Sequence, residues 1–77
     1  MNSEIFDRVK VVLTEQLNCG SEIKPEERLQ EDLGADSLDV IFIVMTLEDE
    51  FNIEILDTEL NSVKTVEDVV RYIEGKL

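Results

Sequence analysis

Ser37 is the side chain whose surroundings in the sequence say most about chemistry. It lies between Asp36 and Asp39, and the chain of 77 residues contains no histidine. A serine hydroxyl attacks a substrate only when a neighbouring base takes its proton. Without histidine, a serine–lysine pair is the catalytic arrangement that composition leaves open. The nearest basic residues along the chain, however, are Arg28 and Lys64. We therefore expect Ser37 to be modified by another enzyme and not to be catalytic.

A helix is expected to begin at Ser37. Asp36 is suited to the N-cap, and Asp39 occupies the third position of an acidic capping box. The apolar and acidic residues that follow extend the helix to about Phe51. The open N–H groups of a first helical turn favour a phosphate on a side chain located there, whereas the two aspartates repel it. A divalent cation carried by the modifying enzyme would relieve that repulsion.

The helix expected over 37–51 carries more apolar residues than one core-facing stripe needs. One stripe at helical spacing consists of Val40, Ile43, Val44, Leu47 and Phe51. A second stripe, beside Ser37, consists of Leu38, Ile41, Phe42 and Met45. Because so small a chain has little interior, we expect the second stripe, edged by Glu48 and Asp49, to be a docking surface. Burial of both stripes in a bundle is the alternative that the pattern leaves open.

Acidic residues dominate the composition, with 19 Asp and Glu against 7 Lys and Arg and a formal net charge of -12. Between residues 29 and 63 there is no basic residue, while acidic residues recur throughout. Such a charge repels nucleic acids and anionic membranes and attracts partners with basic patches. We expect no nucleic-acid partner and no membrane insertion. A solvated face that only keeps the protein soluble is the plainer alternative.

No other group of residues has the spacing of a catalytic or metal site. One cysteine, Cys19, and no histidine cannot form a zinc site, and the sequence has no calcium-binding loop. It also lacks a glycine-rich phosphate loop and a dinucleotide-binding fingerprint. We therefore expect no metal and no enzyme activity. Cys19, which has no partner for an internal disulfide, is expected to be a part-buried apolar residue of a soluble cytoplasmic protein without a signal or transit segment.

The segment before residue 37 is expected to contain a helix and a long connection. Apolar residues at helical spacing predict a helix from about 3 to 18, capped by Ser3 and stopped by Gly20. The connection through 21–35 is long for a compact domain, which indicates a function or a short helical turn within it. The residues of this connection expected to reach the core are Ile23, Leu29 and Leu33.

Two helices are expected after residue 51. A short one opens at Asp57 or Thr58 and runs through Leu60. The last is capped by Thr65, with Asp68 completing the capping box and Gly75 as its stop. The residues of this helix expected to face the core are Val66, Val69, Val70 and Ile73. Three longer helices, one short helix and no strand signal make residues 1–77 a single all-α domain, a small bundle.

Residues 32–39 read Asp-Leu-Gly-Ala-Asp-Ser-Leu-Asp. Downstream of them the chain contains the pairs Val44-Met45, Leu47-Glu48, Glu50-Phe51, Glu54-Ile55 and Thr65-Val66. Together these motifs resemble the attachment motif and the following segments of type II acyl carrier proteins. The resemblance covers nearly the whole chain.

The resemblance implies a four-helix bundle in which Ser37 receives a covalent 4'-phosphopantetheine arm from a carrier-protein synthase, which is a phosphopantetheinyl transferase. The thiol of the arm then holds growing acyl chains as thioesters in fatty acid biosynthesis, and the bundle shelters the chain between helices. Implied partners of the monomeric carrier are ketosynthases, reductases, dehydratases and acyltransferases with basic patches. The matching docking positions are Asp36, Leu38, Asp39, Ile41, Met45, Glu48 and Asp49.

Two positions depart from the family pattern. Phe42 replaces a glutamate that is frequent in the family, which removes a contact for basic partners and extends the apolar patch. We therefore add Phe42 to the docking positions and hypothesise a narrower or altered set of partners. Leu56 replaces a frequent proline, which leaves the start of the third helix less defined.

Other functions stay open at this point. Within the same class they are a carrier for a polyketide or other specialised acyl pathway, or a peptidyl or D-alanyl carrier. In a different class, the chain would be an unmodified acidic interaction module in which Ser37 only begins a helix.

Overall fold

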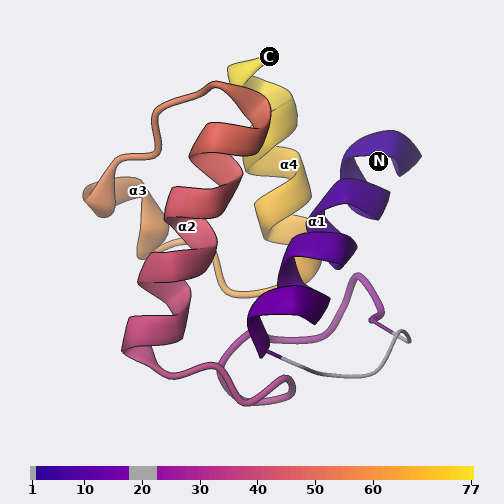
Figure 1. Ribbon diagram of the computed structural model, residues 1–77, viewed down its shortest axis with the longest axis vertical. Coiled ribbons are helices and arrows are strands. Elements are labelled where there is room, and N and C mark those ends of the chain that lie inside the picture. Colours follow the sequence, from indigo (N-terminus) through magenta and orange to yellow (C-terminus); the bar gives the residue numbers. More distant parts are fainter. Residues whose placement is uncertain (1, 18–22) are drawn as a thin grey trace.

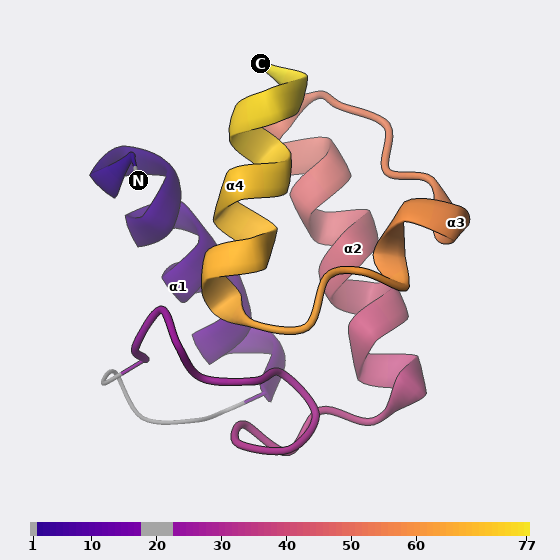
Figure 2. The same ribbon diagram turned by 180° about the vertical axis from the view of Figure 1, so that it is seen from behind.

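The computed structural model describes residues 2–17 and 23–77, and these residues contain four α-helices. They are α1 (Ser3–Leu17), α2 (Ser37–Phe51), α3 (Asp57–Leu60) and α4 (Val66–Lys76). α1, α2 and α4 form the bundle, and α3 lies on the far side of α2 from α1 (Figure 1, Figure 2). The described residues form no strand, so the all-α bundle expected from the sequence is confirmed.

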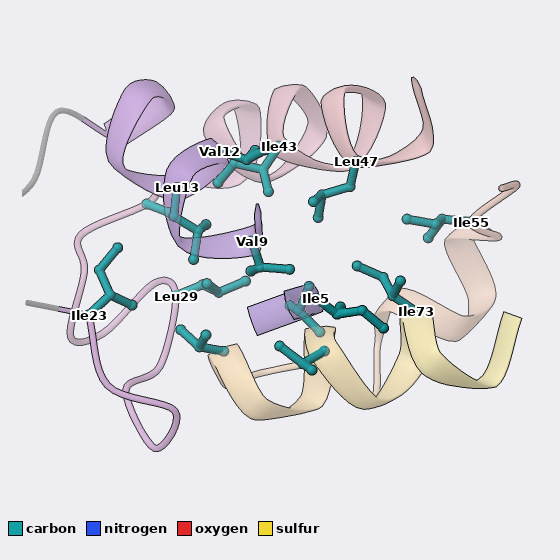
Figure 3. Packing of buried hydrophobic residues seen from close by; sticks show 14 residues of the cluster. Ile5, Val9, Val12, Leu13, Ile23, Leu29, Ile43, Leu47, Ile55 and Ile73 are labelled. Atoms are coloured by element: carbon teal, nitrogen blue, oxygen red, sulfur yellow. The ribbon is translucent and has the colours of Figure 1, made fainter. Parts of the chain in front are cut away.

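The core of the bundle lies between α1, α2 and α4. Side chains at helical spacing fill it, and in Figure 3 Val9, Ile43 and Ile73 converge from the three helices. Ile43 and Leu47 of the core-facing stripe of α2 are buried, and Val40, Val44 and Phe51 are half-buried against them. Each fully buried aliphatic side chain contributes about 1.5–3 kcal/mol. The four expected residues of α4 are all buried: Val66, Val69, Val70 and Ile73.

The connection between α1 and α2 is fixed through Leu29. The N–H of Leu29 donates to the carbonyl oxygen of Lys64 at 3.0 Å, and its own carbonyl oxygen accepts from the N–H of Ala35 at 2.9 Å. The side chain of Leu29 is buried, as is that of Ile23, while Leu33 is half-buried, so all three reach the core as expected. A loop that runs beside Ser37 is thereby held against the segment that begins α4.

Both predicted capping boxes are present. In α2 the Asp36 side chain accepts from the N–H of Asp39, and the Asp39 side chain accepts from the N–H of Asp36. In α4 Thr65 and Asp68 exchange the same pair of hydrogen bonds. α3 begins at Asp57, as expected, although no side chain caps it.

The predicted cap of α1 is wrong. Ser3 is the first helical residue, and the cap is Asn2. The side-chain oxygen of Asn2 accepts hydrogen bonds from the N–H groups of Glu4 at 2.9 Å and Ile5 at 3.2 Å. Asn2 precedes the helix by one residue, so its side chain can reach the open N–H groups of the first turn, which is the position a cap requires.

The predicted stop of α4 is also wrong. The helix continues through Gly75 to Lys76, and Gly75 does not have the positive φ of a glycine C-cap. Gly34 does have a positive φ, of 77°, which turns the chain just before α2. The stop expected at Gly20 and the part-buried Cys19 lie outside the described residues.

The carboxylate of Asp68 gives the start of α4 a dependence on pH. It accepts hydrogen bonds from the N–H groups of Lys64 and Thr65, each at 3.1 Å. The hydrogen bond from Lys64 is the main reason why the pKa of Asp68 lies below its ordinary value of 3.8, against the opposing effect of partial burial. Because the pKa is lowered in the folded state, the stabilisation is complete above the unfolded-state pKa and is lost as pH falls through the folded-state pKa.

We expect Asp68→Asn to lower the free energy of unfolding by about 1 kcal/mol at neutral pH, because the amide is a weaker acceptor than the carboxylate. The difference should shrink toward zero as pH falls below the ordinary pKa of an aspartate. Urea unfolding of both proteins at several pH values measures it. Asp49→Asn removes the same charge from an exposed residue without a hydrogen bond among those described, and it is the matched control. A pH-independent difference between the two variants would contradict the assignment.

Candidate functional site

Ser37 lies at an exposed corner of the molecule where α2 begins. It is the first helical residue, as expected, and its side chain is exposed. Within the described residues its hydroxyl makes no hydrogen bond, and the N–H groups of Ser37 and Leu38 have no acceptor. Nothing in the described chain activates this hydroxyl, while the open N–H groups and the helix dipole favour an anion attached to it.

The two aspartates beside Ser37 hold the start of α2 in place. The N–H of Asp39 donates to the Asp36 carboxylate at 2.8 Å, and the N–H of Asp36 donates to the Asp39 carboxylate at 3.3 Å. Asp36 is extended, with φ of -92° and ψ of -179°. These carboxylates therefore position Ser37 as well as adding negative charge around it.

A groove of about 380 Å³ opens beside Ser37. Its walls come from the first turns of α2, the end of α3 and the two segments joined at Leu29. They include the apolar side chains of Val40, Ile41 and Leu60 and the polar side chains of Gln30, Asn61 and Lys64. The groove is thus amphipathic, and Ser37 is one of the residues that line it.

A smaller apolar pocket, of about 40 Å³, lies deeper in the molecule between α2, α3 and α4. Four side chains line both this pocket and the groove: Leu29, Val40, Leu60 and Val63. The pocket has room for only a few water-sized groups, since about 10–15 Å³ suffices for one. The groove at Ser37 and the apolar pocket are therefore neighbours that share these four side chains as walls.

The second apolar stripe of α2 is exposed, as expected. The exposed fractions are 60% for Leu38, 52% for Ile41, 45% for Phe42 and 55% for Met45. Burial of both stripes in the bundle is therefore excluded. An exposed row of four large apolar side chains beside Ser37 is the kind of surface that partner proteins cover.

The two acids at the edge of this stripe differ in their surroundings. Asp49 is exposed and has no hydrogen bond or ion pair among the described residues. Glu48 is half-buried, and its carboxylate accepts a hydrogen bond from the N–H of Ile55 at 2.8 Å. The carbonyl oxygen of Glu48 also accepts from the N–H groups of Asn52 and Ile53 at the end of α2. Glu48 therefore shapes the loop between α2 and α3, a role that the sequence did not reveal.

The groove and its cations were also not predicted. Arg28 and Lys64 were noted only as the nearest basic residues along the chain. In the structure both line the groove with Ser37, because Leu29 pairs with Lys64 through its backbone. Leu29 and Lys64 are 35 positions apart, and no local sequence pattern indicates a backbone hydrogen bond between residues so distant. The sequence therefore gives no signal from which the groove could be predicted.

The described residues hold no cluster of Cys, Asp or Glu that could bind a metal ion. None of the helices built from them is both long enough and apolar enough to cross a membrane.

Comparisons with known proteins agree on one family. The family model described as a phosphopantetheine attachment site matches residues 7–73. An acyl carrier protein from Wolinella succinogenes is 59% identical over 71 residues, which are 91% of this chain and 93% of the relative. One from Helicobacter hepaticus is 56% identical over 73 residues, or 94% and 96% of the two chains. The solved structure of a candidate acyl carrier protein from Mycobacterium tuberculosis has a TM-score of 0.88 at 30% identity and covers 92% of this chain and 96% of that one.

The hydrogen bond between Glu48 and Ile55 can be tested by substitution. Glu48→Ala leaves the N–H of Ile55 without its acceptor, and we expect a loss of about 1 kcal/mol in the free energy of unfolding. Glu48→Gln keeps an acceptor oxygen and should lose less than half of that. Asp49→Ala, which removes the neighbouring exposed acid, should change stability by less than about 0.5 kcal/mol. Equal losses for Glu48→Ala and Asp49→Ala in urea unfolding would show that the hydrogen bond does not stabilise the loop.

Proposed function

We propose, because this chain belongs to the acyl carrier protein family, that Ser37 is the residue that carries its 4'-phosphopantetheine arm. The chain functions as a non-catalytic acyl carrier in fatty acid biosynthesis. The arm supplies a terminal thiol on which growing acyl chains are held as thioesters. A phosphopantetheinyl transferase attaches the arm, and enzymes of fatty acid synthesis act on the acyl group.

The observation that carries the assignment to Ser37 is its exposed side chain in the lining of the groove. The side chain is exposed, lies within the family's matched range of 7–73, and opens onto about 380 Å³ of amphipathic space. A phosphodiester on its oxygen would meet the open N–H groups of Ser37 and Leu38. The remaining part of the arm, which is a chain of amides and methylenes, suits walls that include both apolar side chains and the amides of Gln30 and Asn61.

Ser37 takes no active part in its own modification. Its hydroxyl makes no hydrogen bond to a base among the described residues, so we expect the transferase to supply the group that takes the proton. Asp36 and Asp39 raise the cost of bringing a second negative charge to this corner. A divalent cation brought by the transferase would offset that cost by bridging the carboxylates and the incoming phosphate.

The partner-docking surface is the exposed stripe of α2 together with the acids around it. The apolar members are Leu38, Ile41, Phe42 and Met45, and the acidic members are Asp36, Asp39, Glu48 and Asp49. Apolar contact would supply affinity, and the acids would steer the basic patches of ketosynthases, reductases, dehydratases and acyltransferases. Asp49 is the most available of the acids, because each of the other three accepts a hydrogen bond within the fold.

An acyl chain is sheltered by passing from the groove into the apolar pocket. The pocket of about 40 Å³ is too small for a long chain as it stands, so its walls must move apart. α3 is the wall that can move most readily, because it has four residues and no side-chain cap. Displacement of Leu60 on this helix and of Val63 beyond it would join the two spaces.

The carrier would work as a single-domain monomer in the cytoplasm. A radius of gyration of 11.0 Å supports one domain, since about 11–12 Å is expected for a domain of this length. The net charge of -12 supports a monomer, because identical chains repel one another.

Incubation with coenzyme A and a broad-specificity phosphopantetheinyl transferase tests the attachment site directly. Intact mass spectrometry of the wild type should show the gain of one phosphopantetheine group. Ser37→Ala should show none, and Ser3→Ala, which removes another exposed serine at the first position of a helix, should behave like the wild type. A mass gain that survives in Ser37→Ala would refute the assignment.

The role of Phe42 is tested by restoring a negative charge there. We expect Phe42→Glu to raise kcat/KM of elongation by a generic ketosynthase about two- to five-fold, the effect of one exposed ion pair. Val11→Glu makes the same change at an exposed apolar residue of α1, away from the stripe, and should leave the rate unchanged. Equal rates for wild type and Phe42→Glu would remove the hypothesis that Phe42 alters the set of partners.

A further inference from the structure

Two basic side chains line the groove beside Ser37, and only one of them is available to an anion. The guanidinium of Arg28 forms ion pairs with the carboxylates of Glu31 and Asp32, the latter at 3.4 Å. The ammonium of Lys64 forms no ion pair and no hydrogen bond with any described residue. Lys64 is exposed and lines the groove. It is therefore the one unpaired cation of the groove within the described chain.

The backbone fixes Lys64 relative to Ser37. The carbonyl oxygen of Lys64 accepts from the N–H of Leu29, and the carbonyl oxygen of Leu29 accepts from the N–H of Ala35, two residues before the serine. The antiparallel bridge between Arg28 and Thr65 flanks the first of these hydrogen bonds. Lys64 is thus joined through backbone hydrogen bonds to the start of α2, and it lines the same groove as Ser37.

We propose that the ammonium of Lys64 binds the phosphodiester that links the arm to Ser37, so that the unoccupied arm rests in this groove. The inference rests on the proposed attachment to Ser37. A phosphodiester carries one negative charge, and at this corner it would lie among the carboxylates of Asp36 and Asp39. Among the described residues, Lys64 is the only cation lining the groove that can offset that charge without giving up an existing ion pair.

The same contact gives the arm a direction. A phosphodiester held by Lys64 would keep the arm in the groove, whose lining includes Asn61 and Leu60 and, from the exposed stripe of α2, only Ile41. The amide of Asn61 then faces the amide groups of the arm. A partner that covers the stripe with a basic patch offers the phosphodiester a competing cation, and the arm leaves the groove when that patch binds.

The experiment uses the modified protein, with attachment first confirmed by intact mass. The ³¹P resonance of the phosphodiester is recorded at about 10 mM and about 1 M salt, where the Debye length falls from about 30 Å to about 3 Å. In the wild type the resonance should move as salt breaks the contact. In Lys64→Gln it should already lie near the high-salt position at low salt, and its movement should be less than half that of the wild type.

Lys24→Gln is the matched control. Lys24 is exposed, has no ion pair among the described residues and does not line the groove. Because Lys24→Gln also replaces one lysine by glutamine, it changes the net charge as Lys64→Gln does. This variant should keep the salt response of the wild type. A Lys64→Gln response equal to that of the wild type, or to that of Lys24→Gln, would overturn the inference while leaving the attachment to Ser37 intact. Attachment that survives Ser37→Ala would overturn both.

The backbone amide signals give an independent reading. Attachment of the arm should shift the signals of Asn61 and Lys64, and the shifts should be reduced in Lys64→Gln but not in Lys24→Gln. Circular dichroism of both variants checks that the helices are unchanged. Unshifted signals at both residues in the modified wild type would show that the arm lies elsewhere.

Discussion

The peptide of Leu29 is the constraint on which the rest of the site depends. Its N–H and carbonyl groups pair with Lys64 and Ala35, so one residue of a connecting loop joins the start of α2 to the segment that begins α4. Its side chain is buried and lines both the groove and the apolar pocket. α1 contacts both α2 and α4 and holds them in one bundle, whereas Leu29 and Lys64 supply part of the wall of the groove beside Ser37.

Hydrogen bonds to carboxylates organise the same end of the bundle, where α2 and α4 both begin (Figure 1, Figure 2). Asp36 and Asp39 close the first turn of α2, and Asp68 closes the first turn of α4 and also accepts from the N–H of Lys64. The acidic residues of this protein, whose net charge is -12, therefore do more than keep a solvated surface: some of them stabilise helix starts. Several of them are tied to backbone N–H groups, which restricts how many remain available to partners.

Sequence reasoning succeeded where the determining interactions are local. The capping boxes join residues three positions apart, and the two stripes of α2 follow from helical spacing. Both features could therefore be predicted from the sequence alone. Its errors were local too. Asn2 caps α1 in place of Ser3, because asparagine and serine are about equally good caps and position decides between them, and Gly75 continues α4 because a glycine near a helix end need not adopt positive φ. The groove could not be predicted, since it depends on the pairing of Leu29 with Lys64.

The division of labour along α2 explains how a passive serine can serve many enzymes. Its inner stripe is fixed by the core, its first turn presents Ser37, and its outer stripe is left exposed. The Glu48 carboxylate accepts a hydrogen bond from the loop to α3, whereas Asp49 is exposed and makes no hydrogen bond among the described residues, so these adjacent acids differ in how free they are. Under the docking role proposed above, the exposed stripe with Phe42 would add apolar contact, which is sensitive to the shape of the partner surface. The net charge of -12 would then act mainly on how quickly basic partners meet the carrier.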